Sequence, residues 1–91
     1  MIRCEVTITN PLGLHARAAA RFVHTASAYT SSVRVSRGGR DMDGKSIMGL
    51  LLLAAAQGTT ITIAVAGPDE QQAVDALRTL VAHGFDESRC V

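Results

Sequence analysis

Three segments of this chain alternate apolar and polar residues with a period of two, and this pattern constrains the fold more than any other feature. The apolar positions are Ile2, Cys4, Val6 and Ile8, then Val33 and Val35, then Ile61, Ile63 and Val65. Because successive side chains of a strand point to opposite faces, each segment is predicted to be a β-strand with one buried and one solvated face. A sheet built from such strands needs a cover on one side only.

A hairpin and a first helix are predicted between these strands. Gly38 and Gly39 form a turn signal, and a short polar strand over residues 40–43 returns along the second strand. From residue 16 the apolar period becomes helical. The apolar positions spaced i, i+3, i+4 and i+7 are Ala19, Phe22, Val23 and Ala26.

Two further helices are predicted in the second half of the chain. Residues 47–56 form a helix that is apolar nearly all round, and the run from Gln57 to Thr59 ends it. The last helix begins with Pro68 near its first position, and Gly84 is its predicted C′ residue, just beyond the helix end. Its buried stripe is Val74, Leu77 and Val81.

The predicted order is βαββαβα, in one domain over residues 1–91. Each strand has one apolar face and each outer helix one apolar stripe. We therefore predict an α+β open-faced β-sandwich, a four-stranded antiparallel sheet with three helices on one face and the other face solvated.

The net charge and the cysteine positions indicate which class of partner and which cellular compartment to expect. Nine Lys and Arg residues against eight Asp and Glu give a net charge of +1, which argues against nucleic acid as the main partner. Cys4, on an apolar strand face, is predicted to be a buried thiol, and Cys90, near the C-terminus, to be free, as in a reducing cytoplasm. The longest apolar run, residues 47–56, is too short to cross a membrane, and no signal peptide is evident.

His15 is the residue best placed for chemistry, between the turn residues 10–13 and the first predicted helix. A helix N-terminus has unpaired N–H groups and a positive field, which favour a neutral nucleophilic ring and can hold a phosphoryl group placed on it. Arg17 can add a charge-assisted hydrogen bond to that group. The plainer alternative, a capping histidine beside a solvated arginine, stays open on these residues alone.

Other polar residues give weaker signals. Ser46 directly precedes the apolar middle helix, so it is an N-cap by default and a candidate phosphorylation site otherwise. His24 lies within the first predicted helix and is interpreted as a surface residue. His83 lies at the end of the last predicted helix, where a histidine is favourable by its charge. No metal-ligand cluster, nucleotide loop or catalytic triad is recognisable, so no cofactor and no metal are expected.

The middle helix has more large apolar residues than one face can bury. These residues are Ile47, Met48, Leu50, Leu51, Leu52 and Leu53. Either some of them form an exposed docking patch or the helix is more deeply buried than usual, and the sequence leaves both open.

Two motifs together resemble a known family. Gly-Leu-His-Ala-Arg at residues 13–17 and Lys-Ser-Ile-Met-Gly-Leu-Leu at residues 45–51 are similar to HPr, the histidine-containing phosphocarrier of the bacterial phosphoenolpyruvate:sugar phosphotransferase system. The resemblance extends over essentially the whole chain, and the family's fold is the open-faced sandwich predicted above.

The resemblance implies a role for each candidate residue. His15 would be the phosphorylated nucleophile, receiving phosphate from enzyme I and passing it to enzyme IIA domains, with Arg17 stabilising the phosphate. Ser46 would be the site of HPr kinase/phosphorylase. Ile47, Met48 and Leu51 would form the docking patch. The chain would then be a monomeric carrier and not an enzyme in its own right.

Two features depart from the family or leave its branch open. Ala18 stands where the family usually has proline, which affects the rigidity of the turn more than the chemistry. The ending Gly84-Phe85-Asp86-Glu87 is more similar to the nitrogen-related branch, so sugar uptake and a regulatory phosphorelay both remain possible.

Two other functional classes are weighed against the carrier. A regulatory interaction module would act through Ser46 and the apolar patch without phosphotransfer, but it would need neither His15 nor Arg17. An RNA-binding sheet is disfavoured, because the polar face predicted for the sheet has no aromatic residue for base stacking. The residues of that face are Arg3, Glu5, Thr7, Thr60 and Thr62.

Overall fold

The computed structural model describes residues 1–89 and confirms the predicted order of strands and helices. Its elements are β1 (Ile2–Thr7), α1 (Ala16–Ser27), β2 (Ser32–Arg37), β3 (Arg40–Asp43), α2 (Ile47–Leu52), β4 (Thr60–Ala66), α3 (Glu70–Ala82) and a final 3-10 segment, η1 (Gly84–Arg89).

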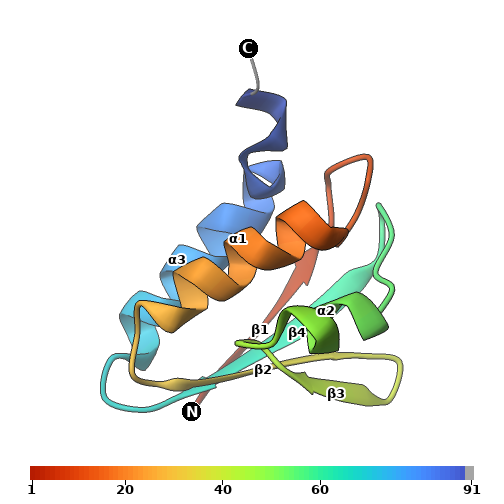
Figure 1. Cartoon of the computed structure of the whole chain (residues 1–91). Coiled ribbons are helices and arrows are strands. Elements are labelled where there is room, and N and C mark those ends of the chain that lie inside the picture. The colour runs from red at the N-terminus through yellow and green to blue at the C-terminus, as the bar shows by residue number, and fades with distance from the viewer. Residues whose placement is uncertain (90–91) are drawn as a thin grey trace.

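The strands form one antiparallel sheet in the order β1-β4-β2-β3. In its register Ile63 on β4 lies between Cys4 on β1 and Val35 on β2, so the apolar positions share one face. The α1 and α3 helices lie side by side across that face, and α2 lies beside β3 (Figure 1). The predicted α+β open-faced sandwich is confirmed.

The core lies between the helices and the apolar face of the sheet. It is mostly aliphatic, as expected for a sequence with 3% aromatic residues. Its largest fully buried side chains are Phe22, Phe85, Ile8, Leu50, Leu53, Ile61, Ile63, Leu77, Val33, Val35, Val65 and Val74. Burial of these side chains is the main stabilising contribution to the fold.

The predicted extent of the middle helix is wrong, because α2 ends at Leu52 and not at residue 56. Beyond it Ala54 has a φ of 51°, and Leu53 is buried in the core. Two arginines of the β2–β3 hairpin close the end of the helix: Arg37 donates to the carbonyl of Leu53 at 3.0 Å and Arg40 to that of Leu52 at 2.7 Å. Cationic donors stabilise a helix C-terminus at this position.

Two smaller expectations are also corrected. The thiol of Cys4 is half-buried and not fully buried; burial raises its pKa, Arg78 lowers it and Asp75 raises it further. The α3 helix begins at Glu70 with Asp69 as its N-cap, so Pro68 precedes the helix. Cys90, the other predicted thiol, lies outside the described residues.

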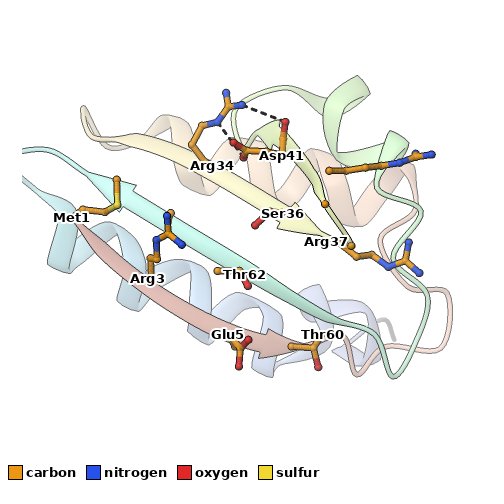
Figure 2. Close-up of a pocket in the computed structure, with 13 residues that line it drawn as sticks. Met1, Arg3, Glu5, Arg34, Ser36, Arg37, Asp41, Thr60 and Thr62 are labelled. Atoms are coloured by element: carbon orange, nitrogen blue, oxygen red, sulfur yellow. Dashed lines mark hydrogen bonds and ion pairs between the residues drawn. The ribbon is translucent and has the colours of Figure 1, made fainter.

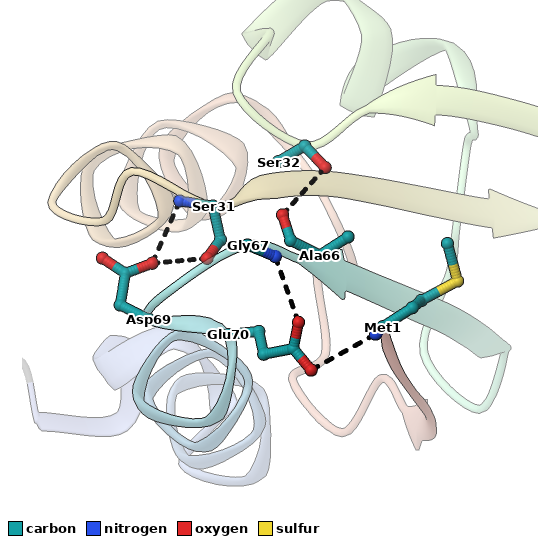
Figure 3. Close-up of polar contacts among 7 residues, drawn as sticks. All are labelled: Met1, Ser31, Ser32, Ala66, Gly67, Asp69 and Glu70. Carbon is teal, nitrogen blue, oxygen red and sulfur yellow. Dashed lines mark hydrogen bonds and ion pairs between the residues drawn. The ribbon is translucent and has the colours of Figure 1, made fainter.

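The side chain of Asp69 connects the start of α3 to the start of β2 instead of capping its own helix (Figure 3). Its Oδ1 accepts from the Ser31 hydroxyl at 2.5 Å and from the Ser31 amide at 3.0 Å, and its Oδ2 accepts from the Thr30 amide at 2.9 Å. These bonds, first of all the one from the Ser31 hydroxyl, lower the pKa of Asp69 to about 2.

We expect Asp69→Asn to remove part of the acid dependence of stability. The pKa of Asp69 is lower in the folded state than its ordinary 3.8, so the ionised carboxylate stabilises the fold above about pH 4 and loses this effect as the pH falls through about 2. Thermal unfolding between pH 2 and 7 should therefore show a lower melting temperature for the variant near pH 6, and a difference from wild type that shrinks below pH 4.

Asp75→Asn is the matched control, because it removes the same charge from α3, where Gln71 is the one hydrogen-bond donor to Asp75 among residues 1–89. Its melting temperature should follow the wild-type pH curve. Parallel curves for Asp69→Asn and wild type over the whole pH range would contradict the role given to Asp69.

Candidate functional site

His15 is the N-cap of α1, as the sequence predicted, and a close approach of two loops determines its position. The amide of Leu14 donates to the carbonyl of Ala55 at 2.8 Å. A Cβ atom on Gly13 would lie 2.6 Å from the same carbonyl oxygen, and Gly13 has a φ of +67°. Only glycine can occupy this position, so Gly13 lets the loop before α1 rest on the loop after α2.

The turn before His15 is held from within by Asn10, which is buried. The Asn10 side-chain amide donates to the carbonyl of Gly13 at 2.7 Å, and the Gly13 amide donates to the Asn10 carbonyl at 3.1 Å. The His15 amide in turn donates to the Gly13 carbonyl at 3.0 Å. This network fixes the backbone that leads into the helix.

The imidazole of His15 is partly exposed and turned toward its own helix. Its Nδ1 accepts a hydrogen bond from the amide of Arg17 at 3.3 Å, and its backbone carbonyl accepts from Ala19 at 2.8 Å. An imidazole nitrogen that accepts a hydrogen bond carries a lone pair. A ring nitrogen with a lone pair therefore lies beside the positive end of a twelve-residue helix.

Arg17 is exposed at the second position of α1. Spacings of four and seven residues place Arg21 and His24 on the same helix face. All three line a shallow depression of about 500 Å³ that Leu80 of α3 also borders. Arg21 lies outside the motif at residues 13–17, and its i+4 spacing from Arg17 is the signal in the sequence that places it beside Arg17.

Ser46 is the N-cap of α2, and its hydroxyl accepts from the amide of Gly49 at 3.1 Å. The capping interpretation is therefore confirmed. The hydroxyl is partly exposed beside the apolar surface of the same helix.

The apolar residues of α2 divide between the core and the surface. Ile47, Met48 and Leu52 are 42%, 67% and 51% exposed, whereas Leu50 is fully buried. Leu51, which was expected to be exposed with Ile47 and Met48, is half-buried against the core. The expectation of an apolar surface patch on this helix holds, with Leu52 as a member that was missed.

A further exposed leucine lies in the turn just before His15. Leu12 is 70% exposed, although the neighbouring Leu14 is buried. The packing of the turn does not require an apolar side chain at this position. The signal available in the sequence was a leucine between Pro11 and Gly13, where turn chemistry favours polar residues.

The other two histidines occupy the positions expected of surface residues. His24 lies in the last turn of α1 and His83 is the C-cap of α3, and both are exposed. Within residues 1–89, no group of three or more His, Cys, Asp or Glu side chains could hold a metal ion. In the same part of the chain, no helix is long and apolar enough to cross a membrane.

Comparisons of sequence identify the family of this chain. The family model for the PTS HPr component phosphorylation site matches residues 2–83. The chain is 51% identical over 87 residues to the phosphocarrier protein HPr of Cupriavidus necator, and the matched region covers 96% of this chain and 98% of that protein. It is 49% identical over 84 residues to the HPr of Pseudomonas aeruginosa, covering 91% and 93%.

Solved structures give the same result for the fold. HPr-C-His from Thermoanaerobacter tengcongensis has a TM-score of 0.92 at 39% identity, covering 96% of this chain and 98% of that chain. HPr from Bacillus anthracis has a TM-score of 0.84 at 35% identity, covering 88% and 95%. This chain therefore belongs to the HPr family, the phosphocarrier proteins of the phosphotransferase system.

Proposed function

We propose that residues 1–91 act as one monomeric carrier domain that receives a phosphoryl group on Nδ1 of His15 from enzyme I and transfers it to enzyme IIA domains. The observation that carries this proposal is the hydrogen bond from the Arg17 amide to Nδ1, which directs the lone pair of that nitrogen toward the helix N-terminus. Family membership supports the phosphocarrier role in general.

The transfer would be an in-line displacement at phosphorus. The hydrogen bond from the Arg17 amide to Nδ1 breaks, and the lone pair that accepted it forms the new N–P bond. The N–P bond of the donor histidine breaks at the same time, and the electron pair of that bond returns to the donor ring. No other covalent step is needed. Positioning and electrostatic stabilisation therefore supply most of the catalysis, and the partner proteins provide much of both.

The start of α1 would hold the phosphoryl oxygens after transfer. The N–H groups of the first turn, from Ala16 to Ala18, have no partner within the helix by its geometry, and the N–H of Arg17, which donates to Nδ1 of His15, is released when the N–P bond forms. Alanine at position 18 keeps an N–H that proline would lack. The guanidinium of Arg17, which makes no hydrogen bond to any residue in the described range, would add a charge-assisted bond.

The exposed apolar residues of α2 would dock both partners. Ile47, Met48 and Leu52 offer an apolar surface, and Leu51 contributes its exposed part. One shared surface suits a carrier, because donor and acceptor must each bring a reactive group to the same histidine. The same surface would also serve a regulatory module that does not transfer phosphate, which is the second candidate function.

Labelling of the wild-type chain tests the proposal directly. The purified protein is mixed with enzyme I, Mg²⁺ and labelled phosphoenolpyruvate, and the label is tested for acid lability and located by mass spectrometry. We expect one acid-labile phosphoryl group on His15, which passes on when an enzyme IIA domain is added. Absence of label on the folded protein, with an enzyme I shown to be active, would contradict the carrier function.

Phosphorylation of Ser46 is proposed to lower carrier activity, with HPr kinase/phosphorylase as the modifying enzyme. We expect Ser46→Asp to slow phosphoryl transfer from enzyme I by about tenfold, because a negative charge beside the docking surface repels a phosphorylated partner. The measurement is the initial rate of His15 labelling at limiting enzyme I.

Ser46→Ala is the control for that substitution. It removes the hydrogen bond to the Gly49 amide, and loss of such a cap costs about 1 kcal/mol of stability. It adds no charge, so its labelling rate should stay close to that of wild type. Equal slowing in both variants would assign the effect to the lost cap and refute regulation by charge.

A further inference from the structure

The face of the sheet that carries no helix is hollowed into a trough of about 640 Å³ (Figure 2). Its floor consists of small residues on the two central strands, and longer charged side chains rise around it. The floor residues are Ser36 on β2 and Thr60, Thr62 and Ala64 on β4.

Four arginines border this trough. They come from three different strands: Arg3 from β1, Arg34 and Arg37 from β2, and Arg40 from β3. The register places Arg3 on β1 and Arg34 on β2 on either side of Ala64. Since neighbouring strands are about 4.8 Å apart, the two Cα atoms are separated by roughly 10 Å, and both guanidinium groups can reach a ligand above the alanine.

Two carboxylates lie among these arginines. Arg34 pairs with Asp41 at 3.4 Å, and Glu5 is the other carboxylate at the trough. Arg37 and Arg40 donate to carbonyls at the end of α2, so their guanidinium groups are turned toward that helix end, and Arg3 and Arg34 are the two arginines available to a ligand in the trough.

Arg3 differs from the other three arginines of the trough. Its side chain makes no hydrogen bond or ion pair with any residue in the described part of the chain. In Figure 2 it rises from β1 between Met1 and Thr62. Its guanidinium therefore has all five N–H donors available to a ligand.

We propose that this trough binds the di- or triphosphate group of a small metabolite. Guanidinium groups match phosphate oxygens in a bidentate geometry, and the volume is that of a small-molecule site. None of the described residues that line the trough is aromatic, so a base would find no stacking surface and the phosphates alone would be recognised. The trough lies on the face opposite α1 and His15, so this proposal stands apart from the carrier function.

Amide NMR titration of the full chain with sodium tripolyphosphate at low salt tests the site. We expect saturable shifts centred on Arg3, Arg34 and Ala64. Arg3→Gln should weaken binding about tenfold, the loss typical of one hydrogen-bonded charged contact. Asp41→Asn should strengthen it severalfold, since it removes a carboxylate that competes for Arg34. The dissociation constant of adenosine triphosphate should lie within about twofold of that of tripolyphosphate if the trough contacts only the phosphates.

Arg78→Gln is the matched control, because it removes one exposed positive charge from α3 and leaves the trough unchanged. Its affinity should remain that of wild type. Equal weakening by Arg78→Gln and Arg3→Gln, or shifts that do not saturate, would overturn the site in favour of general charge attraction. Affinity for oligothymidylate that rises with length above that of tripolyphosphate would also overturn it, in favour of a nucleic acid.

Discussion

Replacing His15 with alanine is expected to abolish acid-labile phosphorylation of this chain by enzyme I and phosphoenolpyruvate. The substitution removes Nδ1, the nitrogen whose lone pair faces the start of α1. No other side chain occupies that position, so the label should fall to background and not merely decrease. The measurement is the incorporation of label from phosphoenolpyruvate over a time long enough to saturate the wild-type protein.

The matched controls are His24→Ala and His83→Ala, which remove the other two histidines from exposed positions. Both should accept phosphate at nearly the wild-type level. The fold of His15→Ala should persist, because loss of its capping bond to the Arg17 amide costs about 1 kcal/mol. Label retained in His15→Ala, or lost in either control, would place the phosphoryl group on another residue.

The same variant separates the carrier from the regulatory module. A carrier with His15→Ala should still bind enzyme I, because the proposed docking surface on α2 is unchanged, while its relay activity disappears. Calorimetry measures whether the variant still binds enzyme I, and a cell-based assay measures whether regulation persists without phosphoryl transfer. Regulation that persists in full without relay would favour the module that acts through Ser46 and the apolar surface.

Leu50→Ala is expected to give the largest loss of stability among substitutions in α2. Leu50 is fully buried and is the residue through which the helix is anchored in the core. Truncation of a buried leucine costs about 2–5 kcal/mol, which lowers the melting temperature of a domain this size by roughly 10–30 °C. Denaturant and thermal unfolding both measure this effect.

Met48→Ala gives the comparison within the same helix, because Met48 is 67% exposed. Its stability should change by less than about 0.5 kcal/mol, as is usual for surface positions. Its affinity for enzyme I should fall instead. Similar stability losses for the two variants would show that the division of α2 into a buried and an exposed side is wrong.

Much of this fold could be predicted because its signals are local. The strands were evident from a period of two, since a half-buried sheet requires alternation. The N-caps of α1 and α2, His15 and Ser46, could also be predicted, because capping depends on residues adjacent in sequence. The proposed nucleophile and its neighbour Arg17 lie on such a local element, which is why the motif sufficed to indicate them.

The end of α2 could not be predicted, because distant residues decide it. The apolar run continues past Leu52, but Arg37 and Arg40 bind the last carbonyls and Leu53 is buried in the core. The difference between the exposed Leu52 and the half-buried Leu51 has the same origin. Composition cannot distinguish neighbouring leucines, and only the packed orientation of the helix does.

The sequence by itself therefore determined the order of strands and helices, the fold class and the N-caps of the first two helices. The tertiary structure decided the strand order β1-β4-β2-β3, the contact of the His15 loop with Ala55 and the burial of Phe85 by a turn in which Gly84 and Asp86 also have positive φ. The physical reason is the sequence separation over which each interaction acts. Periodicity, turns and caps act between residues a few positions apart, whereas burial and loop contacts depend on side chains that only the folded chain brings together.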